Sequence, residues 1–233
     1  ASWNWSAGCA ARHATAIRRP RKNEYFRQDE AGEQVLIVFD IGNVLIRWDP
    51  RAAFRHALGD DAAIDALFDE VGFHDWNLEQ DRGRRRADAV AEIKAHWPQH
   101  AALMDGFFDR FGLTIRDRIE GSWRIIADLR ARGHPVWALT NWGPDTWDVA
   151  VRLHPGLDTE LDGIVVSGHE GLAKPDPRIF ELFCDSAGSA PGDCFFTDDS
   201  AANVAAARAA GWQAHQFTGA GGLRAELRDR GLL

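Results

Sequence analysis

Acidic, hydroxyl, amide and ammonium side chains that could act together in catalysis stand at or just after the ends of short apolar runs. They are Asp40, Thr140, Asn141, Lys174, Asp198 and Asp199. Carboxylates brought close together repel one another unless a lysine or a bound cation offsets their charge. Mg²⁺ prefers oxygen ligands and combines one or two carboxylates with a phosphate oxygen. If these segments meet, the residue types predict a Mg²⁺ site that can bind a phosphate oxygen.

Each of these residues also has an ordinary structural interpretation when it is taken alone. The aspartates could cap helices or begin turns. Thr140 and Asn141 could begin a helix before Pro144, and Lys174 could be a solvated surface side chain. The shared site is favoured because the residues fall, in order, at the ends of predicted strands, and ligands of open α/β sheets bind beyond the carboxyl ends of the strands.

The apolar runs that precede these residues predict the strands. Val35 to Phe39 is apolar throughout, without alternation, which is typical of a strand buried on both faces. Further strands are predicted at 135–139, 163–167, 194–197 and 212–217. Helical patterns lie between them, one of them opened by Asp176-Pro177 with the proline at the first helical position. The alternation predicts an α/β fold, a parallel sheet with helices on both faces.

A helical region is predicted directly after the first strand. Helical spacing of apolar residues recurs at 51–69, 84–97 and 101–112, and residues 51–118 hold no strand pattern. Residues 76–83 fall between two of these helices. They could roof the site, with Trp76, Glu79 and Arg82 touching the substrate, or they could pack the helical region against the rest.

The predicted organisation therefore has three parts. They are a disordered or leader-like arm at 1–34, a catalytic core at 35–50 and 119–233, and a helical cap at 51–118.

Composition limits the classes of partner. The 233 residues carry a net charge of -8, which argues against general binding of nucleic acid or of an anionic membrane. No apolar run approaches the ~18 residues that a membrane span needs. Three cysteines without metal-ligand spacing indicate the reducing cytosol. A small phosphorylated metabolite is the predicted partner, and the sequence does not determine an oligomeric state.

Four motifs resemble those of the haloacid dehalogenase-like hydrolases. They read FDIGNVL, ALTN, KPDPRIF and FFTDDSAANV, in this order. The resemblance runs from about Val35 to the C-terminus, and a helical region at 51–118 fits the cap that part of this family carries after the first motif. The resemblance implies a Rossmann-like core and an aspartate nucleophile.

The resemblance also implies a role for each motif residue. Asp40 would attack phosphorus and form an aspartyl-phosphate, which is a known role of carboxylates. Thr140, Asn141 and Asn43 would bind the phosphoryl group, and Lys174 would neutralise charge between nucleophile and phosphate. The predicted Mg²⁺ ligands are Asp40, Asp199, Asp198 and the backbone carbonyl of Gly42.

One position departs from the family pattern. Phosphatases of the family usually carry a second aspartate two positions after the nucleophile, as general acid and base, and this chain has Gly42 there. Three explanations are open. The leaving group needs no protonation, a cap residue such as His74, Glu79 or Asp81 replaces the aspartate, or the protein binds phosphate without catalysis. The dehalogenase branch also lacks this aspartate and needs no metal, but Asp198-Asp199 is a pair typical of the metal-dependent members. A phosphatase is therefore favoured over a 2-haloacid dehalogenase.

Overall fold

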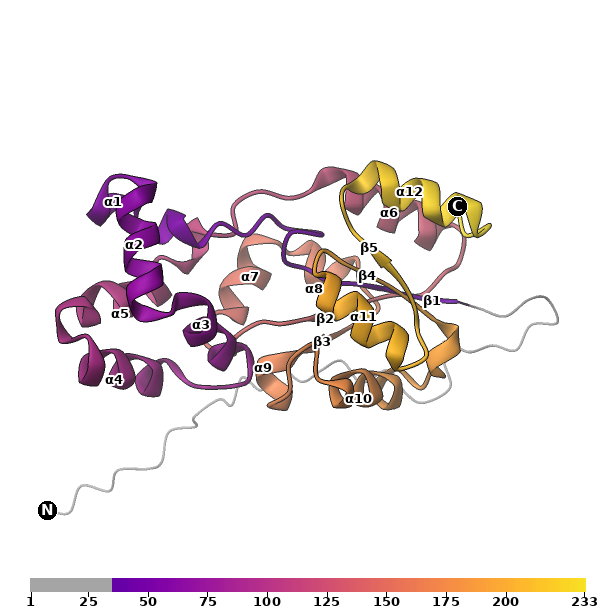
Figure 1. Cartoon of the computed structure of the whole chain (residues 1–233). Helices are drawn as coiled ribbons and strands as arrows, with labels where there is room; N and C mark the ends of the chain where they lie inside the picture. The colour runs from indigo at the N-terminus through magenta and orange to yellow at the C-terminus, as the bar shows by residue number, and fades with distance from the viewer. Residues whose placement is uncertain (1–34) are drawn as a thin grey trace, which may run out of the picture.

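A five-stranded parallel sheet forms the centre of the computed structural model, which describes residues 35–233 (Figure 1). The predicted arm at 1–34 lies outside the described residues. The strands are β1 (Leu36–Phe39), β2 (Val136–Thr140), β3 (Gly163–Val166), β4 (Cys194–Asp198) and β5 (Gln213–Gln216). Their order is β3-β2-β1-β4-β5, so β1 lies between β2 and β4. From β1 the chain first adds β2 and β3 on one side and then β4 and β5 on the other. Open α/β sheets bind ligands at such a switch point.

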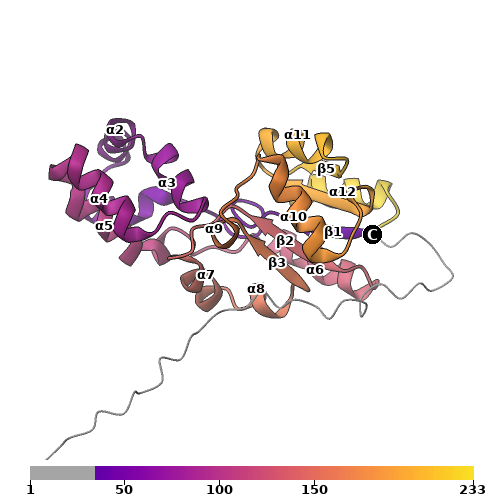
Figure 2. The ribbon, with the colours of Figure 1, turned by 90° about the horizontal axis from the view of Figure 1, so that it is seen from below.

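Both faces of the sheet are covered, which explains the unbroken apolar run of β1. Ile37 and Phe39 pack on one face with α6 (Glu120–Ala131), α7 (Trp147–Leu153), α8 (Gly156–Thr159) and α12 (Ala220–Asp229). Leu36 and Val38 pack on the other face with α10 (Pro177–Ala187) and α11 (Ala201–Ala209). Figure 2 shows α10 and α11 on one side of the sheet and α6, α7 and α8 on the other. The predicted α/β, Rossmann-like fold class is confirmed.

The segment between β1 and α6 is helical, as predicted, and contains no strand. Its elements are η1 (Pro50–Ala53), α1 (Arg55–Leu58), α2 (Asp61–Val71), α3 (Phe73–Asp81), α4 (Arg86–His96), η2 (Pro98–His100), α5 (Ala101–Asp109) and η3 (Phe111–Leu113). We call residues 50–113 the helical insertion. Its aromatic core includes Phe54, Phe73 and Phe107, with ring centroids 5.5–6.0 Å apart. The expectation that 76–83 links two helices is wrong for most of its length, because α3 runs to Asp81.

Caps set the starts of the helices that follow the site residues. The Asp176 side chain accepts a hydrogen bond from the backbone of Arg178 at the start of α10, with Pro177 as the first helical residue. Ser200 caps α11 by accepting from the backbone of Asn203. The short helices α9 (Ser167–Glu170) and η4 (Pro191–Asp193) complete the described elements. Among the described residues no helix has the length and apolar character to span a membrane.

Candidate active site

Lys174 occupies the centre of the polar cluster at the carboxyl ends of the strands. Its ammonium donates to Asp40 Oδ1 at 2.8 Å, to Asp198 Oδ2 at 2.7 Å and to the backbone carbonyl of Leu139 at 2.8 Å. All three donor positions of the side chain are thus used. Burial alone would lower the pKa of Lys174, but the charges of Asp40 and Asp198 outweigh it and the pKa lies above its ordinary value. Lys174 is a fixed positive charge, 2% exposed.

Asp198 serves mainly to hold this cluster together. Its Oδ1 accepts from the backbone of Ser200 at 2.8 Å, and the amide of Asn203 contacts both carboxylate oxygens at 3.1 Å. Together with the Lys174 ion pair, these contacts compensate a fully buried carboxylate. Asn203 was not among the predicted site residues, although it stands three residues after the Ser200 cap within the FFTDDSAANV motif.

Three carboxylates converge at the ends of β1 and β4. One carboxylate oxygen of Asp40, one of Asp198 and one of Asp199 lie within 4.8 Å of one another. Burial raises the pKa of Asp40 from 3.8 to about 7, the Asp198 charge adds to the rise and Lys174 opposes it. Burial also raises the pKa of Asp199. The cluster therefore carries excess negative charge that a divalent cation would compensate.

The turn after Asp40 places Gly42 and Asn43 beside the carboxylates. Asn43 adopts a left-handed conformation with φ of 55°, which asparagine tolerates better than most residues. Its backbone N–H donates to Ile46 and its side-chain oxygen accepts from the backbone of Trp48 at 3.1 Å. The Asn43 amide also interacts with the Asp199 carboxylate. Gly42 and Asn43 both line the cavity described below.

Thr140 and Asn141, predicted to bind phosphate, differ in their surroundings. The Asn141 amide donates to the backbone carbonyl of Lys174 at 2.9 Å, and its oxygen accepts from the Lys174 backbone N–H at 2.8 Å. Asn141 therefore positions Lys174 as well as lining the cavity. The Thr140 hydroxyl is buried and has no hydrogen-bond partner among the described residues. Since buried hydroxyls are normally paired, this one has unused capacity for a ligand.

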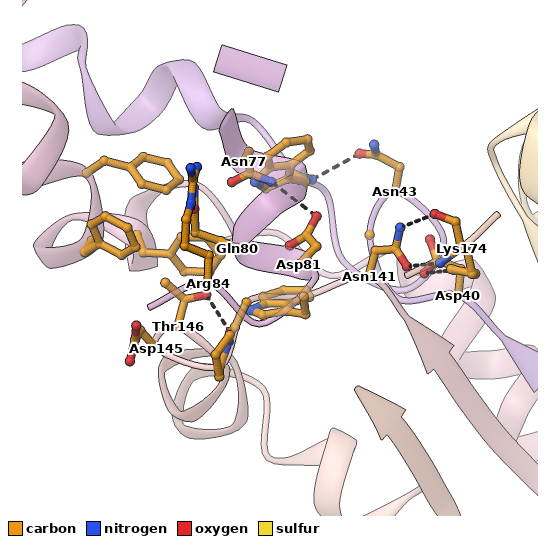
Figure 3. Close-up of a pocket in the computed structure, with 18 of the residues that line it drawn as sticks. Asp40, Asn43, Asn77, Gln80, Asp81, Arg84, Asn141, Asp145, Thr146 and Lys174 are labelled. Atoms are coloured by element: carbon orange, nitrogen blue, oxygen red, sulfur yellow. Dashed lines mark hydrogen bonds and ion pairs between the residues drawn. The ribbon is translucent and has the colours of Figure 1, made fainter. Parts of the chain in front are cut away.

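A cavity of about 230 Å³ extends from Asp40 to the helical insertion (Figure 3). Asn77, Gln80, Asp81 and Arg84 line it from α3 and the turn after it. Their spacing of three, four and seven residues from Asn77 places them along one side of a helix. This signal was present in the sequence, but it could be used only if the segment was taken as a helix. The cavity is also lined by the aromatic residues Trp48, Phe107, Phe108, Phe111 and Trp142.

The three residues that could have touched a substrate from this segment do not line the cavity. Trp76 is buried, packs against Phe107 and donates its indole N–H to the carbonyl of Ala89 at 3.2 Å. Glu79 and Arg82 form an ion pair of 2.7 Å with each other near the surface. The alternative interpretation, that the segment packs the insertion against the sheet domain, fits better. Trp142 lines the cavity and is also part of the core.

The comparison with known proteins agrees with this geometry. Residues 35–211 match the haloacid dehalogenase-like hydrolases. The chain belongs to this family. Sesquiterpene phosphatase astK of Aspergillus oryzae is 26% identical over 82% of this chain and 94% of its own length. Protein CbbY, encoded on a plasmid of Cupriavidus necator, is 29% identical over 59% of this chain, and the match spans only 54% of that relative.

Solved structures share the fold of this haloacid dehalogenase-like hydrolase. A family enzyme from Bacteroides thetaiotaomicron in a magnesium complex has a TM-score of 0.65, with 21% identity over 82% of this chain and 96% of its own. A dehalogenase with an intermediate complex has a TM-score of 0.59, with 20% identity over 80% of this chain and 85% of its own. Phosphatases are therefore found among the sequence relatives, and both magnesium complexes and dehalogenases among the structures of similar fold.

Proposed function

We propose that this hydrolase is an Mg²⁺-dependent phosphatase that acts on a small phosphorylated metabolite through an aspartyl-phosphate on Asp40. The observation that carries the proposal is the charge of the buried cluster. When all three carboxylates are ionised, the single ammonium of Lys174 leaves two negative charges uncompensated. A divalent cation neutralises this excess, and the donors are all oxygens, as Mg²⁺ requires.

The residues that would hold the ion are Asp40, Asp199 and the backbone carbonyl of Gly42, with Asp198 supporting them. When bound, Mg²⁺ would screen the attacking carboxylate from the anionic phosphoryl group. Lys174 would do the same from the other side, since it already donates to Asp40 Oδ1 and keeps that side chain in one orientation. The second oxygen, Oδ2, accepts no hydrogen bond from the described residues and would be the attacking atom.

The chain itself would supply the contacts to the phosphoryl group. Asn43 and Asn141 line the cavity and are the first candidate donors. Thr140 does not line it, and its buried, unpaired hydroxyl at the end of β2 is a further candidate. Asp40 would attack phosphorus as the bond to the leaving oxygen breaks, and water would then attack phosphorus and release the carboxylate and phosphate. The relative named as a sesquiterpene phosphatase supports phosphate ester hydrolysis, and the aromatic cavity wall supports an apolar portion in the substrate.

The alternative functions make different use of the same cluster. A 2-haloacid dehalogenase would displace halide from carbon without a metal, and the negative charge of Asp199 beside Asp40 would then stay without a compensating cation. A non-catalytic phosphate-binding protein would keep the cluster and lack turnover. The cytosolic location indicated by the few cysteines stays a prediction.

The deciding experiment measures phosphate release from 4-nitrophenyl phosphate with Mg²⁺ and with EDTA. Hydrolysis is expected to require the metal, and Asp40→Asn is expected to abolish it. Asp193→Asn is the matched control, because Asp193 is exposed and lies before β4, at the opposite end of that strand from Asp198. Hydrolysis that survives Asp40→Asn would refute the mechanism. Halide release from 2-haloacids that is indifferent to EDTA would favour the dehalogenase.

A further inference from the structure

Phosphatases of this family usually place a general acid at the position of Gly42, and in this chain the cavity offers a carboxylate for that role. We infer that Asp81, at the end of α3 in the helical insertion, is the catalytic general acid and base of this hydrolase. The inference rests on the proposed phosphatase function. It assigns the proton transfers to a part of the chain that the strand-end motifs do not include.

The space beside Asp40 on the Gly42 side is open. A Cβ built on Gly42 would have Asp40 Oδ2 as its single neighbour within 4 Å, at 4.0 Å. Gly42 therefore leaves open the place that a side chain at this position would take, beside the unpaired oxygen of Asp40. A leaving group of a substrate held at that oxygen has room to extend into the cavity, towards the insertion.

Among the residues that line the cavity, few can transfer a proton. The titratable ones are Asp40, Asp81, Arg84, Asp145, Lys174 and Asp199. Asp40, Lys174 and Asp199 belong to the carboxylate cluster. Asp145 is paired with the side chain of Arg85 and accepts from the backbone of Arg86 at 2.6 Å. Arg84 remains protonated and donates to Gln80, Glu92 and the carbonyl of Trp76.

Asp81 is the remaining group and is available for proton transfer. Its Oδ2 accepts one long hydrogen bond, 3.3 Å, from the Asn77 amide, and its Oδ1 accepts none from the described residues. Figure 3 shows its side chain between Asn77 and Asn141, and among the labelled residues of the insertion Asp81 is drawn nearest to Asp40 in that view. His74 and Glu79, the other cap residues considered from the sequence, do not line the cavity.

The backbone at Asp81 is fixed to the sheet domain. Its carbonyl accepts from the Ser167 hydroxyl at 2.5 Å, and that hydroxyl in turn accepts from the backbone N–H of Trp142 at 3.0 Å. Gly83, at φ of 100°, comes so near Gly168 that a Cβ on it would lie 3.1 Å from the Gly168 carbonyl. The carboxyl is therefore presented to the site from a fixed position, as proton transfer requires.

The surroundings of Asp81 favour its protonated form near neutral pH. Burial, reinforced by the charge of Asp40 and opposed by Lys174, raises the pKa of Asp81 from 3.8 to about 7. A general acid is most effective when its pKa lies near the working pH.

The two half-reactions then balance. As Asp40 Oδ2 forms its bond to phosphorus, the bond from phosphorus to the leaving oxygen breaks, and Asp81 gives its proton to that oxygen. An alcohol leaves and Asp81 becomes a carboxylate. Water then forms the new bond to phosphorus while Asp81 takes a proton from it, and the bond from phosphorus to Asp40 breaks. Inorganic phosphate leaves, and Asp81 is protonated again.

The test compares two leaving groups, 4-nitrophenol and 2-phenylethanol, as their phosphate monoesters with Mg²⁺ present. The value of kcat/KM reports steps up to formation of the phospho-enzyme. Asp81→Asn is expected to lower kcat/KM for 2-phenylethyl phosphate by about 10²-fold or more, since an alkoxide needs protonation, and for 4-nitrophenyl phosphate by less than about tenfold. Glu79→Gln, two residues away on the same helix and outside the cavity, is the matched control and is expected to change neither.

Equal loss for both esters, or loss for neither, would overturn the assignment of Asp81. A second measurement uses the unaltered enzyme, so it does not depend on whether Asp81→Asn folds. Across a series of aryl and alkyl phosphates, kcat/KM is expected to vary little with the acidity of the leaving group. A steep dependence would show that no general acid assists departure. An unaltered enzyme that hydrolyses no phosphate ester would instead contradict the proposed function, which separates the two failures.

Discussion

Replacing Asp40, the proposed nucleophile, is expected to stabilise the metal-free protein and to abolish activity. Asp40 is 7% exposed and shares its site with Asp198 and Asp199. Burial raises its pKa from 3.8 to about 7, so the folded protein holds a proton that the unfolded chain has already released. Stability therefore falls as pH rises from about 4 to about 7, and Asp40→Asn removes this loss.

The magnitude follows from the pKa. A rise from 3.8 to about 7 corresponds to about 4 kcal/mol at a pH above both values. The full amount is not expected, because the new amide must still accept a hydrogen bond from Lys174 and because the neighbouring carboxylates share the effect. We expect Asp40→Asn to raise the free energy of unfolding by about 2–4 kcal/mol at about pH 8. Near pH 4 the gain is expected to vanish, since Asp40 is then protonated in the folded protein.

The assay is urea unfolding of the two proteins in EDTA at several pH values, followed by the fluorescence of the buried tryptophans. Saturating Mg²⁺ is expected to reduce the advantage of Asp40→Asn, because a ligand that binds the folded unaltered protein stabilises it. Asp193→Asn, an exposed acid, serves again as control. Equal stability of Asp40→Asn and the unaltered protein at every pH would refute the idea that Asp40 belongs to an electrostatically unfavourable cluster.

Two further substitutions test the geometry around the cavity. Gly42→Asp, placed in the Asp81→Asn background, is expected to raise kcat/KM for 2-phenylethyl phosphate at least about tenfold, because it returns an acid to open space beside Asp40. If activity does not recover, Asp81→Asn does not act by leaving the departing alkoxide without a proton donor. Gly168→Ala is expected to lower the free energy of unfolding by about 1–3 kcal/mol, because its Cβ would lie 2.5 Å from the Trp142 carbonyl. Gly192→Ala, whose Cβ meets no atom within 4 Å, is its control in the same urea titration, and equal stability of the two variants would contradict this close packing.

Local patterns in the sequence determined much of this protein. The apolar run of β1 requires cover on both faces, and polar residues directly after such runs must lie at the sheet edge where parallel strands end. Asp40 and the Asp198-Asp199 pair could be found in this way, whereas Lys174 follows the Gly-rich loop 168–173 and was found with the help of its KPDPRIF motif. The helical character of the insertion followed from spacing as well, although the boundary between helix and linker at 76–83 did not.

The tertiary structure alone decided which of these atoms meet. Lys174 and Asp40 are 134 residues apart, and Ser167 and Asp81 are 86 apart, so no local pattern relates them. Packing between distant segments also decides that the Asn141 amide holds the Lys174 backbone. It likewise sets the direction of α3, which turns Asp81 towards the cavity and leaves Glu79 outside it. Burial also belongs to the fold, because a carboxyl acquires a raised pKa only when other parts of the chain remove it from water.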